Sequence, residues 1–279
     1  MNLSVITGSR ADYGLLEWPL KLLREDPFFS VAEVRIWGQS PAQALQGVTD
    51  YLADAKPDYV LLLGDRFEIM AAAMAAHLQR IPIAHIGGGE ITEGSYDDAM
   101  RDCISRMATL HFATSLPAAL RLERMGYSRI HIVGNPGIDY IRNAPWKKAR
   151  PIAQPYIVVS YQAETIDAEP FIPRFDCLSE RAIAFILPNA DAGSDAIAKA
   201  IFEQKKWSDI VFESLSHADF LNLLAHCEEF IGNSSAILYE APELGIKTRM
   251  IGKRQQGRVP PAGDGKASER IRDILKAHG

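Results

Sequence analysis

The chain has 279 residues, of which 47% are hydrophobic and 23% are charged, and this composition is ordinary for a soluble globular protein. Its length is enough for two modest domains that each bury a core. The formal net charge of −5 gives no reason to expect a nucleic acid or an anionic membrane as a partner. An anionic ligand would have to be held by local features, such as helix amino termini and a few arginines.

The chain begins with MNLSVITGSR, a short expected strand with no basic segment and no signal-peptide core. No apolar run approaches the length of a transmembrane helix. The three cysteines, Cys103, Cys177 and Cys227, lack the spacing of metal ligands. We therefore expect a cytoplasmic protein with reduced thiols and with no metal or other cofactor, so that its activity survives a chelator.

In the first half, apolar runs of strand length alternate with helix-length segments. The expected strands are 3–7, 31–37, 59–63, 81–86, 111–114 and 129–134. The expected helices between them are 14–25, 44–55, 67–80, 98–108 and 117–126. Strands without polar alternation, separated by amphipathic helices, indicate a parallel sheet covered on both faces. This pattern predicts a Rossmann-like, doubly wound α/β domain over residues 1–145.

Residues 143–155, NAPWKKARPIAQP, carry three prolines and a basic cluster, which is typical of a linker, and we place it at about 146–153. The alternating pattern then restarts and predicts a second Rossmann-like domain over residues 154–279. Its expected strands are 156–160, 182–188, 209–214, 228–232 and 248–252, and its expected helices are 171–180, 194–206, 218–227, 236–244 and 267–279. Two such domains leave a cleft between the carboxyl ends of their strands, where ligands of these sheets bind.

Two polar motifs follow the first and third expected strands. In TGSRADYG, Gly8 permits a tight turn and Arg10 can reach a phosphate near the helix amino terminus. A glycine turn with a surface arginine explains the same residues. In LLLGDRFE, Asp65 can cap the following helix or project as a proton-transfer group, and the sequence does not separate these two roles.

The stretch GGGEITEGSYDD places Glu90 beside three glycines, directly after an apolar strand. Asp97, Asp98 and Arg101 then open the next helix, where acidic residues are ordinary helix stabilisers. That explanation does not cover Glu90, for which the close approach of a ligand to the glycine backbone is the better account. We favour a functional role for this stretch, because active sites of α/β sheets lie at strand ends.

The stretch IGNSSAILYEAPELG ends a strand in Asn233-Ser234-Ser235 and begins a helix at once. The serines would offer hydroxyls and backbone N–H groups to an anion, and Glu240 could reach a ribose diol. Simple N-capping by Asn233 or Ser234 is the alternative. The basic loop GKRQQGR, residues 252–258, could close over a diphosphate, although such loops are usually solvated surface.

Taken together, these motifs resemble the hydrolysing UDP-N-acetylglucosamine 2-epimerases of sialic acid and related nonulosonic acid pathways. The matching stretches occur in the expected order in both halves: TGSRADYGLL, LGDRFEIMAAAMAA, HIGGGEITEGSYDDAMR, VGNPGID, PNAD, GNSSAILYEAPELG and GKRQQGR. The family has a two-domain GT-B architecture, which agrees with the interpretation of the strands and helices.

The resemblance implies an enzyme that takes a UDP-linked 2-acetamido sugar, eliminates UDP and hydrates the product to the free 2-epimeric sugar, N-acetylmannosamine or an analogue. It implies Asp65, Glu90 and Asp98 as acid/base residues. It implies these substrate-binding residues: Arg10, Arg66, Arg101, Gln162, Asn189, Asn233, Ser234, Ser235, Glu240, Arg254 and Arg258. The expected partner is the UDP-sugar, with no nucleic acid and no membrane, and a homo-oligomer is compatible with the sequence.

The chain departs from the family at three imidazoles and is shorter, because it lacks an insert that carries a Thr-Gly-x-His segment. Gln162, Gly87 and Asp102 stand where family members carry histidine. A glutamine cannot exchange a proton near neutral pH. His85 and His217 also lie at strand ends, and an ordinary structural histidine is the favoured interpretation of each. A nucleotide-sugar binder without catalysis and a GT-B glycosyltransferase therefore stay open as alternatives.

Overall fold

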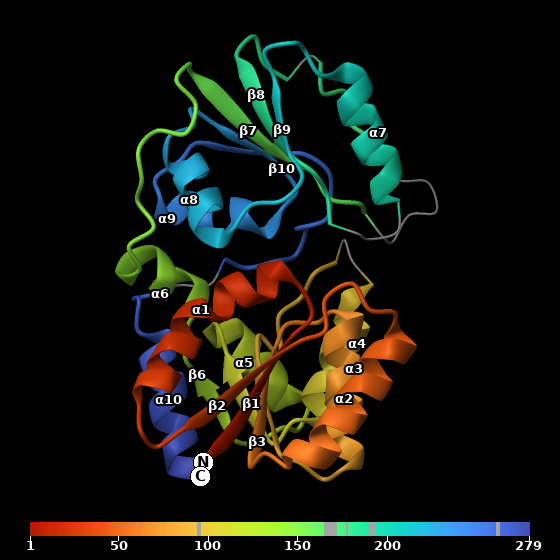
Figure 1. Ribbon diagram of the computed structural model, residues 1–279, viewed down its shortest axis with the longest axis vertical. Helices are drawn as coiled ribbons and strands as arrows, with labels where there is room; N and C mark the ends of the chain where they lie inside the picture. The colour runs from red at the N-terminus through yellow and green to blue at the C-terminus, as the bar shows by residue number, and fades with distance from the viewer. Residues whose placement is uncertain (94–95, 165–171, 177, 190–192, 261–262) are drawn as a thin grey trace. The chain divides into compact units, whose positions relative to one another are not determined.

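The computed structural model describes residues 1–93, 96–164, 172–176, 178–189, 193–260 and 263–279. The chain divides into two compact units (Figure 1). Unit 1 comprises Met1–Ile91, Asp97–Ala144 and Pro261–Gly279, and unit 2 comprises Thr92–Tyr96 and Pro145–Pro260.

Unit 1 contains a parallel sheet in the order β2-β1-β3-β4-β5-β6. Its strands are β1 (Asn2–Thr7), β2 (Ser30–Arg35), β3 (Tyr59–Leu63), β4 (Ile83–Ile86), β5 (Leu110–Ala113) and β6 (Ile130–Ile132). Its helices are α1 (Arg10–Glu25), α2 (Pro41–Ala55), α3 (Phe67–Leu78), α4 (Asp97–Met107), α5 (Leu116–Arg124), α6 (Pro136–Asn143) and α10 (Ala267–His278). The strands and helices predicted for the first half are confirmed, apart from shifts at their ends.

Helices cover both faces of this sheet, as its uniformly apolar strands predict. One buried core joins the sheet to α1 and α10, for example through Leu20 and Ile271. The other joins it to α2, α3 and α4, for example through Leu52, Ile69 and Ile104. Figure 1 shows these two helix layers on opposite sides of the strands.

The chain order in this sheet reverses between β1 and β3, which are hydrogen-bonded neighbours. Ligands of open parallel sheets bind at such a switch point, beyond the carboxyl ends of the strands. The loops that follow these two strands carry Gly8 to Arg10 and Gly64 to Arg66. The topology therefore puts two of the predicted motifs side by side.

Unit 2 contains a parallel sheet in the order β11-β10-β7-β8-β9. Its strands are β7 (Tyr156–Ser160), β8 (Ala182–Ile186), β9 (Ile210–Phe212), β10 (Phe230–Gly232) and β11 (Thr248–Met250), and all five were predicted. Its helices are α7 (Ser194–Gln204), α8 (His217–Ala225), the 3₁₀ turn η1 (Ser235–Ile237) and α9 (Glu240–Glu243). The switch point lies between β7 and β10, where the loops with Gln162 and Asn233 begin.

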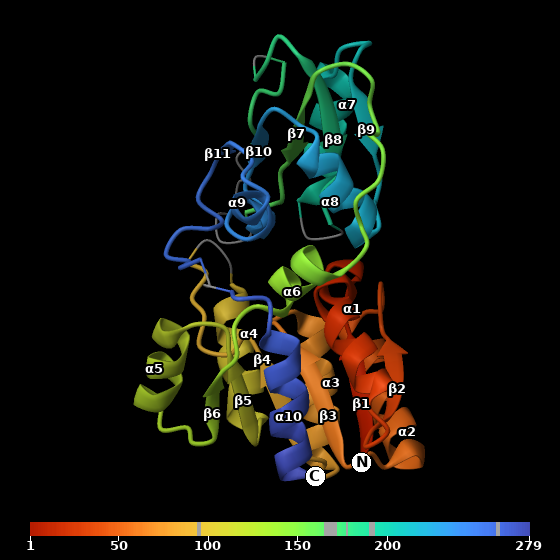
Figure 2. The ribbon, with the colours of Figure 1, turned by 90° about the vertical axis from the view of Figure 1, so that its left-hand side faces the viewer.

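The last helix, α10, belongs to unit 1, whereas the predicted second domain ran to residue 279. Its apolar residues Ile271 and Leu275 pack in the core beneath α1. The carboxylate of Asp139, in α6, accepts hydrogen bonds from the backbone N–H groups of Ala267 and Ser268 and so caps α10. The two chain ends consequently lie together (Figure 2). Amphipathic periodicity predicts such a helix but not the sheet that it covers.

Two predicted helices differ from the structure, and one helix of the structure was not predicted. The segment predicted as helix 171–180 is not helical in its described residues, 172–176 and 178–180; Pro173 interrupts it and Phe175 packs into the core of unit 2. The predicted helix 236–244 is instead η1 followed by the short α9. The helix α6 was missed, although Asn135 caps it and Pro136 occupies its first position.

None of the helices within the described residues is both long and apolar enough to cross a membrane.

Two adjacent strands of unit 1 carry buried neutral histidines, His85 on β4 and His111 on β5. His85 donates from Nε2 to the Gly64 carbonyl and accepts at Nδ1 from the Ser105 hydroxyl. Burial lowers the pKa of both imidazoles to about 4. His85 is therefore a structural histidine, as we expected, and does not replace a missing catalytic imidazole.

The lowered pKa of His111 predicts a loss of stability in acid. Between the unfolded pKa of about 6.5 and the folded pKa of about 4, only the unfolded chain takes up a proton, so stability falls as pH falls. The unfolding free energy should therefore fall between about pH 6.5 and pH 5. We expect that fall to be smaller in His111→Phe than in the unchanged protein, by about 1 to 2 kcal/mol. Urea unfolding at both pH values measures it. His77 is exposed, and His77→Phe is the control, in which the unfolding free energy should fall as much as in the unchanged protein. The same fall in His111→Phe as in the unchanged protein would contradict the prediction.

Candidate active site

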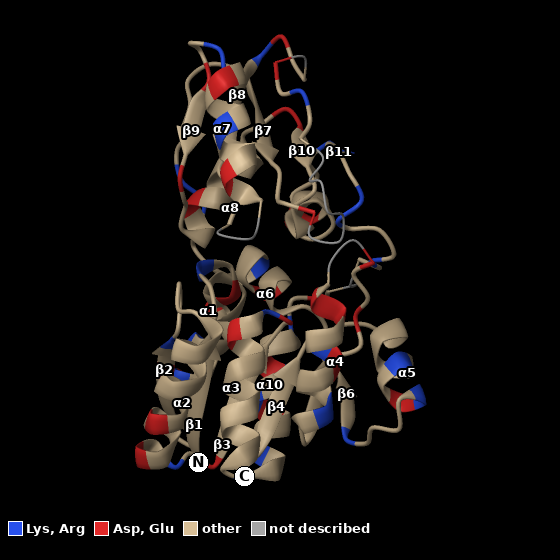
Figure 3. Cartoon of the chain, turned by 90° about the vertical axis from the view of Figure 1, so that its right-hand side faces the viewer, with Lys and Arg blue, Asp and Glu red and all other residues tan. Residues whose placement is uncertain are grey.

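Arg101, in α4, is only 1% exposed. Its guanidinium forms hydrogen bonds with three segments of unit 1. It donates to the carboxylate of Asp65, after β3, and to the carboxylate of Asp98, one turn away. It also donates to the main-chain oxygen of Glu90, at 2.8 Å. Two of the predicted acid/base carboxylates and the main chain of the third thus meet one buried cation. Figure 3 shows the acidic start of α4 in red.

The alternative role of Asp65 as a helix cap is wrong. The N-cap of α3 is Arg66, whose side chain makes no capping hydrogen bond. The Asp65 carboxylate instead binds Arg101. Arg66 itself pairs with the carboxylate of Glu68, with Nε 3.2 Å from Oε2. Because the Arg66 side chain is still 21% exposed, it keeps a surface on which a substrate can bind.

Glu90 follows β4, and its Oε1 accepts a hydrogen bond of 2.7 Å from the hydroxyl of Thr114, which follows β5. Its neighbouring glycines have a structural cause that we did not expect. A Cβ at Gly89, whose φ is +80°, would lie 2.3 Å from the Ala118 carbonyl oxygen of α5. Close packing of α5 therefore requires glycine there, so a close-approaching ligand is not needed to explain it.

Asp12, in the first turn of α1, is a buried carboxyl that the sequence did not single out. Burial raises its pKa to about 7, opposed mainly by the positive charge of Arg66. Its Oδ2 is buried and makes no hydrogen bond within the described residues. An acidic residue in the first turn of a helix is usually explained by its favourable interaction with the helix dipole. Only the burial of Asp12 distinguishes it from such a residue. A carboxyl with this pKa at the β1/β3 switch point is able to exchange a proton near neutral pH.

Arg10 is the first residue of α1 and is exposed. The helix amino terminus beside it is capped by Ser9, whose hydroxyl accepts from the Asp12 backbone N–H. Arg10 therefore begins its helix at the same switch point at which Asp65 follows β3.

In unit 2, hydrogen bonds of the Gln162 and Asn233 side chains connect the loops that follow β7, β8 and β10. Asn233 is fully buried, and its side-chain amide bonds both the backbone N–H and the carbonyl of Gln162, at 2.6 and 2.9 Å. The Gln162 amide accepts from the Asn189 backbone N–H and donates to the Ser160 hydroxyl. The Asn233 side chain therefore holds the loop that carries Gln162, and the Gln162 side chain in turn holds Asn189 and Ser160. Asn189 itself is exposed at the end of β8.

The two serines stand at a tighter turn than we expected. A Cβ at Gly232, at φ +148°, would lie 1.9 Å from the Ser160 carbonyl oxygen, so only glycine lets β10 lie against β7 here. The Ser234 hydroxyl then caps η1 by accepting from the Ala236 backbone N–H. Ser234 and Ser235 are both partly exposed, so their hydroxyls are accessible. The predicted long helix with its amino-terminal dipole is absent from this position.

The basic loop of residues 252–258 is anchored rather than hanging free in solvent. The Lys253 backbone N–H donates to Glu164, and the Arg254 guanidinium donates to the Ala163 carbonyl. Gln255, which is 4% exposed, donates from its amide to the Asn233 carbonyl. Interpretation of this loop as solvated surface is therefore wrong for its middle residues.

Glu240, the first residue of α9, is 8% exposed, and burial raises its pKa to about 7 against the opposing charge of Arg258. The Arg258 guanidinium lies over the Tyr239 ring, 5.3 Å from its centroid. The imidazole Nε2 of His217, at the start of α8, is 3.9 Å from Glu240 Oε1. Unit 2 therefore places one carboxyl, one imidazole and one guanidinium together beyond β9 and β10.

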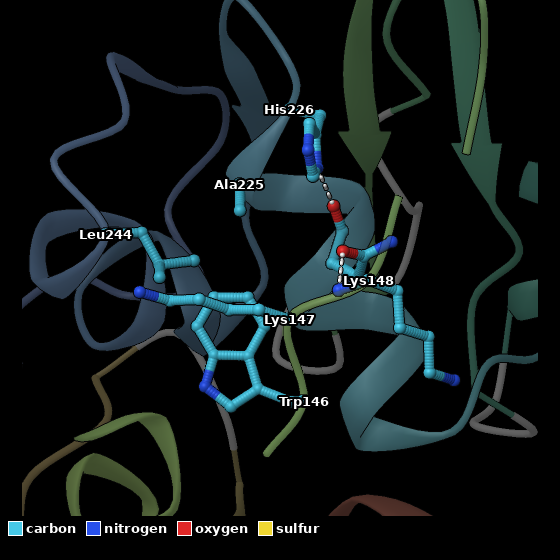
Figure 4. A pocket seen from close by; sticks show the side chains of 7 residues that line it. Trp146, Lys147, Lys148, Ala225, His226 and Leu244 are labelled. Carbon is cyan, nitrogen blue, oxygen red and sulfur yellow. Dashed lines mark hydrogen bonds between the residues drawn. The ribbon is translucent and has the colours of Figure 1, made fainter. Parts of the chain in front are cut away.

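A surface pocket of about 410 Å³ in unit 2 contains none of the predicted site residues (Figure 4). The Asn222 side chain in its wall bonds the backbone of Lys148 and Ala149, and the Lys148 ammonium pairs with Asp219. These polar groups hold the segment after Pro145 against α8. The pocket is lined by Trp146, Lys147, Lys148, Asn222, Ala225, His226 and Leu244.

Within the part of the chain that the structure describes, no group of three or more His, Cys, Asp or Glu side chains could hold a metal ion.

Residues 20–262 match a protein-family model described as UDP-N-acetylglucosamine 2-epimerase. The polysialic acid biosynthesis protein P7 of Escherichia coli is 28% identical, over 91% of this chain and 79% of that protein. The UDP-N,N'-diacetylbacillosamine 2-epimerase (hydrolyzing) of Legionella pneumophila is 29% identical, over 90% of this chain and 80% of that protein.

The crystal structure of UDP-GlcNAc 2-epimerase from Neisseria meningitidis bound to UDP-GlcNAc superposes with a TM-score of 0.81. The superposition covers 99% of this chain and 100% of that one, at 17% identity. At this identity the likeness establishes the fold, which is α/β and GT-B-like with two Rossmann-like domains, as we predicted.

Proposed function

This chain belongs to the UDP-N-acetylglucosamine 2-epimerase family, and we propose that it is a hydrolysing member of it. It would convert a UDP-2-acetamido sugar to UDP and the free 2-epimeric sugar, N-acetylmannosamine or an analogue. The product would serve nonulosonic acid or surface polysaccharide biosynthesis. The names of the Escherichia coli and Legionella pneumophila relatives support this type of reaction and this use.

The observation that carries the proposal is the convergence of Asp65, Glu90 and Asp98 around Arg101. At the carboxyl end of one sheet, Arg101 binds the carboxylates of Asp65 and Asp98 and the main-chain oxygen of Glu90. Proton abstraction beside an acetal needs a carboxylate that is fixed before the substrate arrives. A buried guanidinium with two carboxylates costs stability to assemble, so a purely structural origin is a weak explanation for it.

The proposed reaction has two steps. In the first, a carboxylate removes the proton from C2, the C1–O bond to UDP breaks and a C1=C2 double bond forms. In the second, a carboxyl returns a proton to the opposite face of C2, and water adds its hydroxyl to C1 and gives its remaining proton to a carboxylate. Glu90 is our first candidate for contact with C2, because its side chain is held by the neutral Thr114 hydroxyl while Asp65 and Asp98 share Arg101.

Binding of the nucleotide is assigned to unit 2 and to Arg10. The accessible hydroxyls of Ser234 and Ser235 would hold the diphosphate, with Arg254 and Arg258 supplying positive charge. Glu240 would accept the ribose hydroxyls. Arg10, Arg66 and Asn189 are proposed as further contacts of the sugar-phosphate.

A nucleotide-sugar binder without turnover is the second candidate, and Gln162 favours it. This residue replaces a family histidine, and its amide is already bonded to Asn189 and Ser160. No imidazole is therefore supplied at this position. The carboxyls are all present, so the elimination keeps its acid/base groups.

Incubation of the pure protein with UDP-N-acetylglucosamine and with UDP-N,N'-diacetylbacillosamine tests the proposal. Release of UDP together with a free 2-epimeric sugar, followed by chromatography and NMR, is the expected result. Binding without release would support the binder, and transfer of the sugar to an added acceptor would support a glycosyltransferase. Either of these results would overturn the proposed hydrolysing epimerase.

We expect Glu240→Ala to weaken UDP binding by about tenfold to a hundredfold, because hydrogen bonds to a charged group contribute about 1.5 to 3 kcal/mol. Isothermal titration calorimetry measures the dissociation constant. The exposed Glu213→Ala in the same unit is the matched control and should bind UDP normally. Unchanged affinity in Glu240→Ala would remove the ribose role.

A further inference from the structure

His217 and Glu240 form a buried acid–base pair in unit 2. Their side chains are 9% and 10% exposed, and His217 Nε2 lies 3.9 Å from Glu240 Oε1. This distance is too long for a hydrogen bond, which needs about 2.7 to 3.2 Å. The other carboxyl oxygen, Glu240 Oε2, is buried and makes no hydrogen bond within the described residues. A carboxyl in this state has unused acceptor capacity, and an imidazole nitrogen lies 3.9 Å from its other oxygen.

The charges around Glu240 come from three elements. His217 faces it from α8 and Arg258 faces it from the loop before residue 260. Tyr239 and Glu243 flank it on its own segment. Burial outweighs the Arg258 charge and raises the pKa of Glu240 to about 7, so near neutral pH the empty site holds much of this carboxyl in its protonated form.

A protonated carboxyl accepts two ribose hydroxyls poorly, because one of its oxygens carries a hydrogen. Ribose binding therefore favours the carboxylate, and the displaced proton needs a destination. In a site this buried, an uncompensated carboxylate would also cost free energy.

We propose that His217 is the proton partner of Glu240, so that binding of a nucleoside diphosphate moves the carboxyl proton to the imidazole and creates a carboxylate–imidazolium pair. The inference rests on the proposed ribose role of Glu240. The proton balance is internal: the O–H bond of Glu240 breaks, an N–H bond forms on His217, and no proton enters the solvent. His217 is thus a positioning residue that keeps nucleotide affinity independent of pH.

The test counts protons during binding. UDP-N-acetylglucosamine is the probe, because its diphosphate is esterified at both ends and has no group that titrates near neutral pH. Titrations in buffers of different ionisation enthalpy, at about pH 6, give the number of protons released per ligand. A parent protein that carries Glu90→Gln prevents turnover, and chromatography verifies that the ligand stays intact.

We expect the parent to release no net proton and the added His217→Gln to release about one. Affinity of the His217→Gln protein should fall about tenfold per pH unit below the pKa of Glu240, while the parent stays nearly level. Adding Glu240→Gln should abolish proton release in both backgrounds. His226→Gln, on the same helix but bonded to the Asn222 carbonyl, is the matched control and should behave as the parent.

Equal proton release and equal pH dependence with and without His217 would overturn the inference alone, because binding itself would still support the proposed function. Failure of the parent to bind UDP-N-acetylglucosamine would overturn the proposed function together with this inference. A 2′-deoxyuridine analogue of the ligand should show a smaller difference between the two proteins, since it donates one hydroxyl fewer to Glu240.

Discussion

Replacing Arg101 by methionine is expected to lower the free energy of unfolding by about 3 to 5 kcal/mol and to abolish turnover. The guanidinium is 1% exposed and is the shared partner of the Asp65 and Asp98 carboxylates. Its removal leaves two carboxylates facing one another with their common cation gone. Urea unfolding measures the stability, and the UDP-release assay measures the activity.

Arg106→Met is the matched control, because Arg106 lies on the same helix and is exposed. We expect it to change stability by less than about 0.5 kcal/mol. Adding Asp65→Asn and Asp98→Asn to Arg101→Met should restore part of the lost stability without restoring turnover. A stable Arg101→Met protein would show that the three carboxyl segments are held by other contacts, and the proposed assembly would be wrong.

Glu90→Gln is expected to lower kcat by about a hundredfold to ten-thousandfold while UDP affinity stays nearly unchanged. The amide keeps the shape of the side chain and can still accept the hydrogen bond from Thr114, but it cannot take up a proton. Steady-state assays of UDP release give kcat, and calorimetry with UDP gives the affinity.

Glu93→Gln, three residues further along the chain and exposed, should keep full turnover. If Glu90→Gln also kept full turnover, the acid/base assignment of Glu90 would be wrong. Asp12, whose pKa is raised to about 7, would then be the next carboxyl to substitute.

The strand pattern was predictable because buried parallel strands need uninterrupted apolar residues, and β3 and β7 consist of little else. The same reasoning failed where helical periodicity was weak or local. Residues 171–180 contain enough apolar residues for a helix, but Pro173 and the burial of Phe175 decide otherwise in the described part. The assignment of α10 to unit 1 depends on contacts with α1 and α6, which are distant in the sequence.

For the candidate site, too, the sequence predicted some residues and could not predict others. Strand-end position was enough to select Asp65, Glu90 and Asp98, since ligands of parallel sheets bind at those ends. It could not select Asp12 or the His217–Glu240 pair, because burial raises a carboxyl pKa and burial is a property of the packed chain. It also gave no sign that the Asn233 side chain binds the backbone of Gln162.

By itself, then, the sequence determined the two α/β domains, the order of their strands along the chain and the polar motifs at the strand ends, because these depend on local periodicity and turn chemistry. Only the tertiary structure decided which carboxyls share Arg101, which glycines are required by packing, and which buried groups hold protons. Those properties depend on distances and dielectric surroundings that arise when segments far apart in the chain pack together.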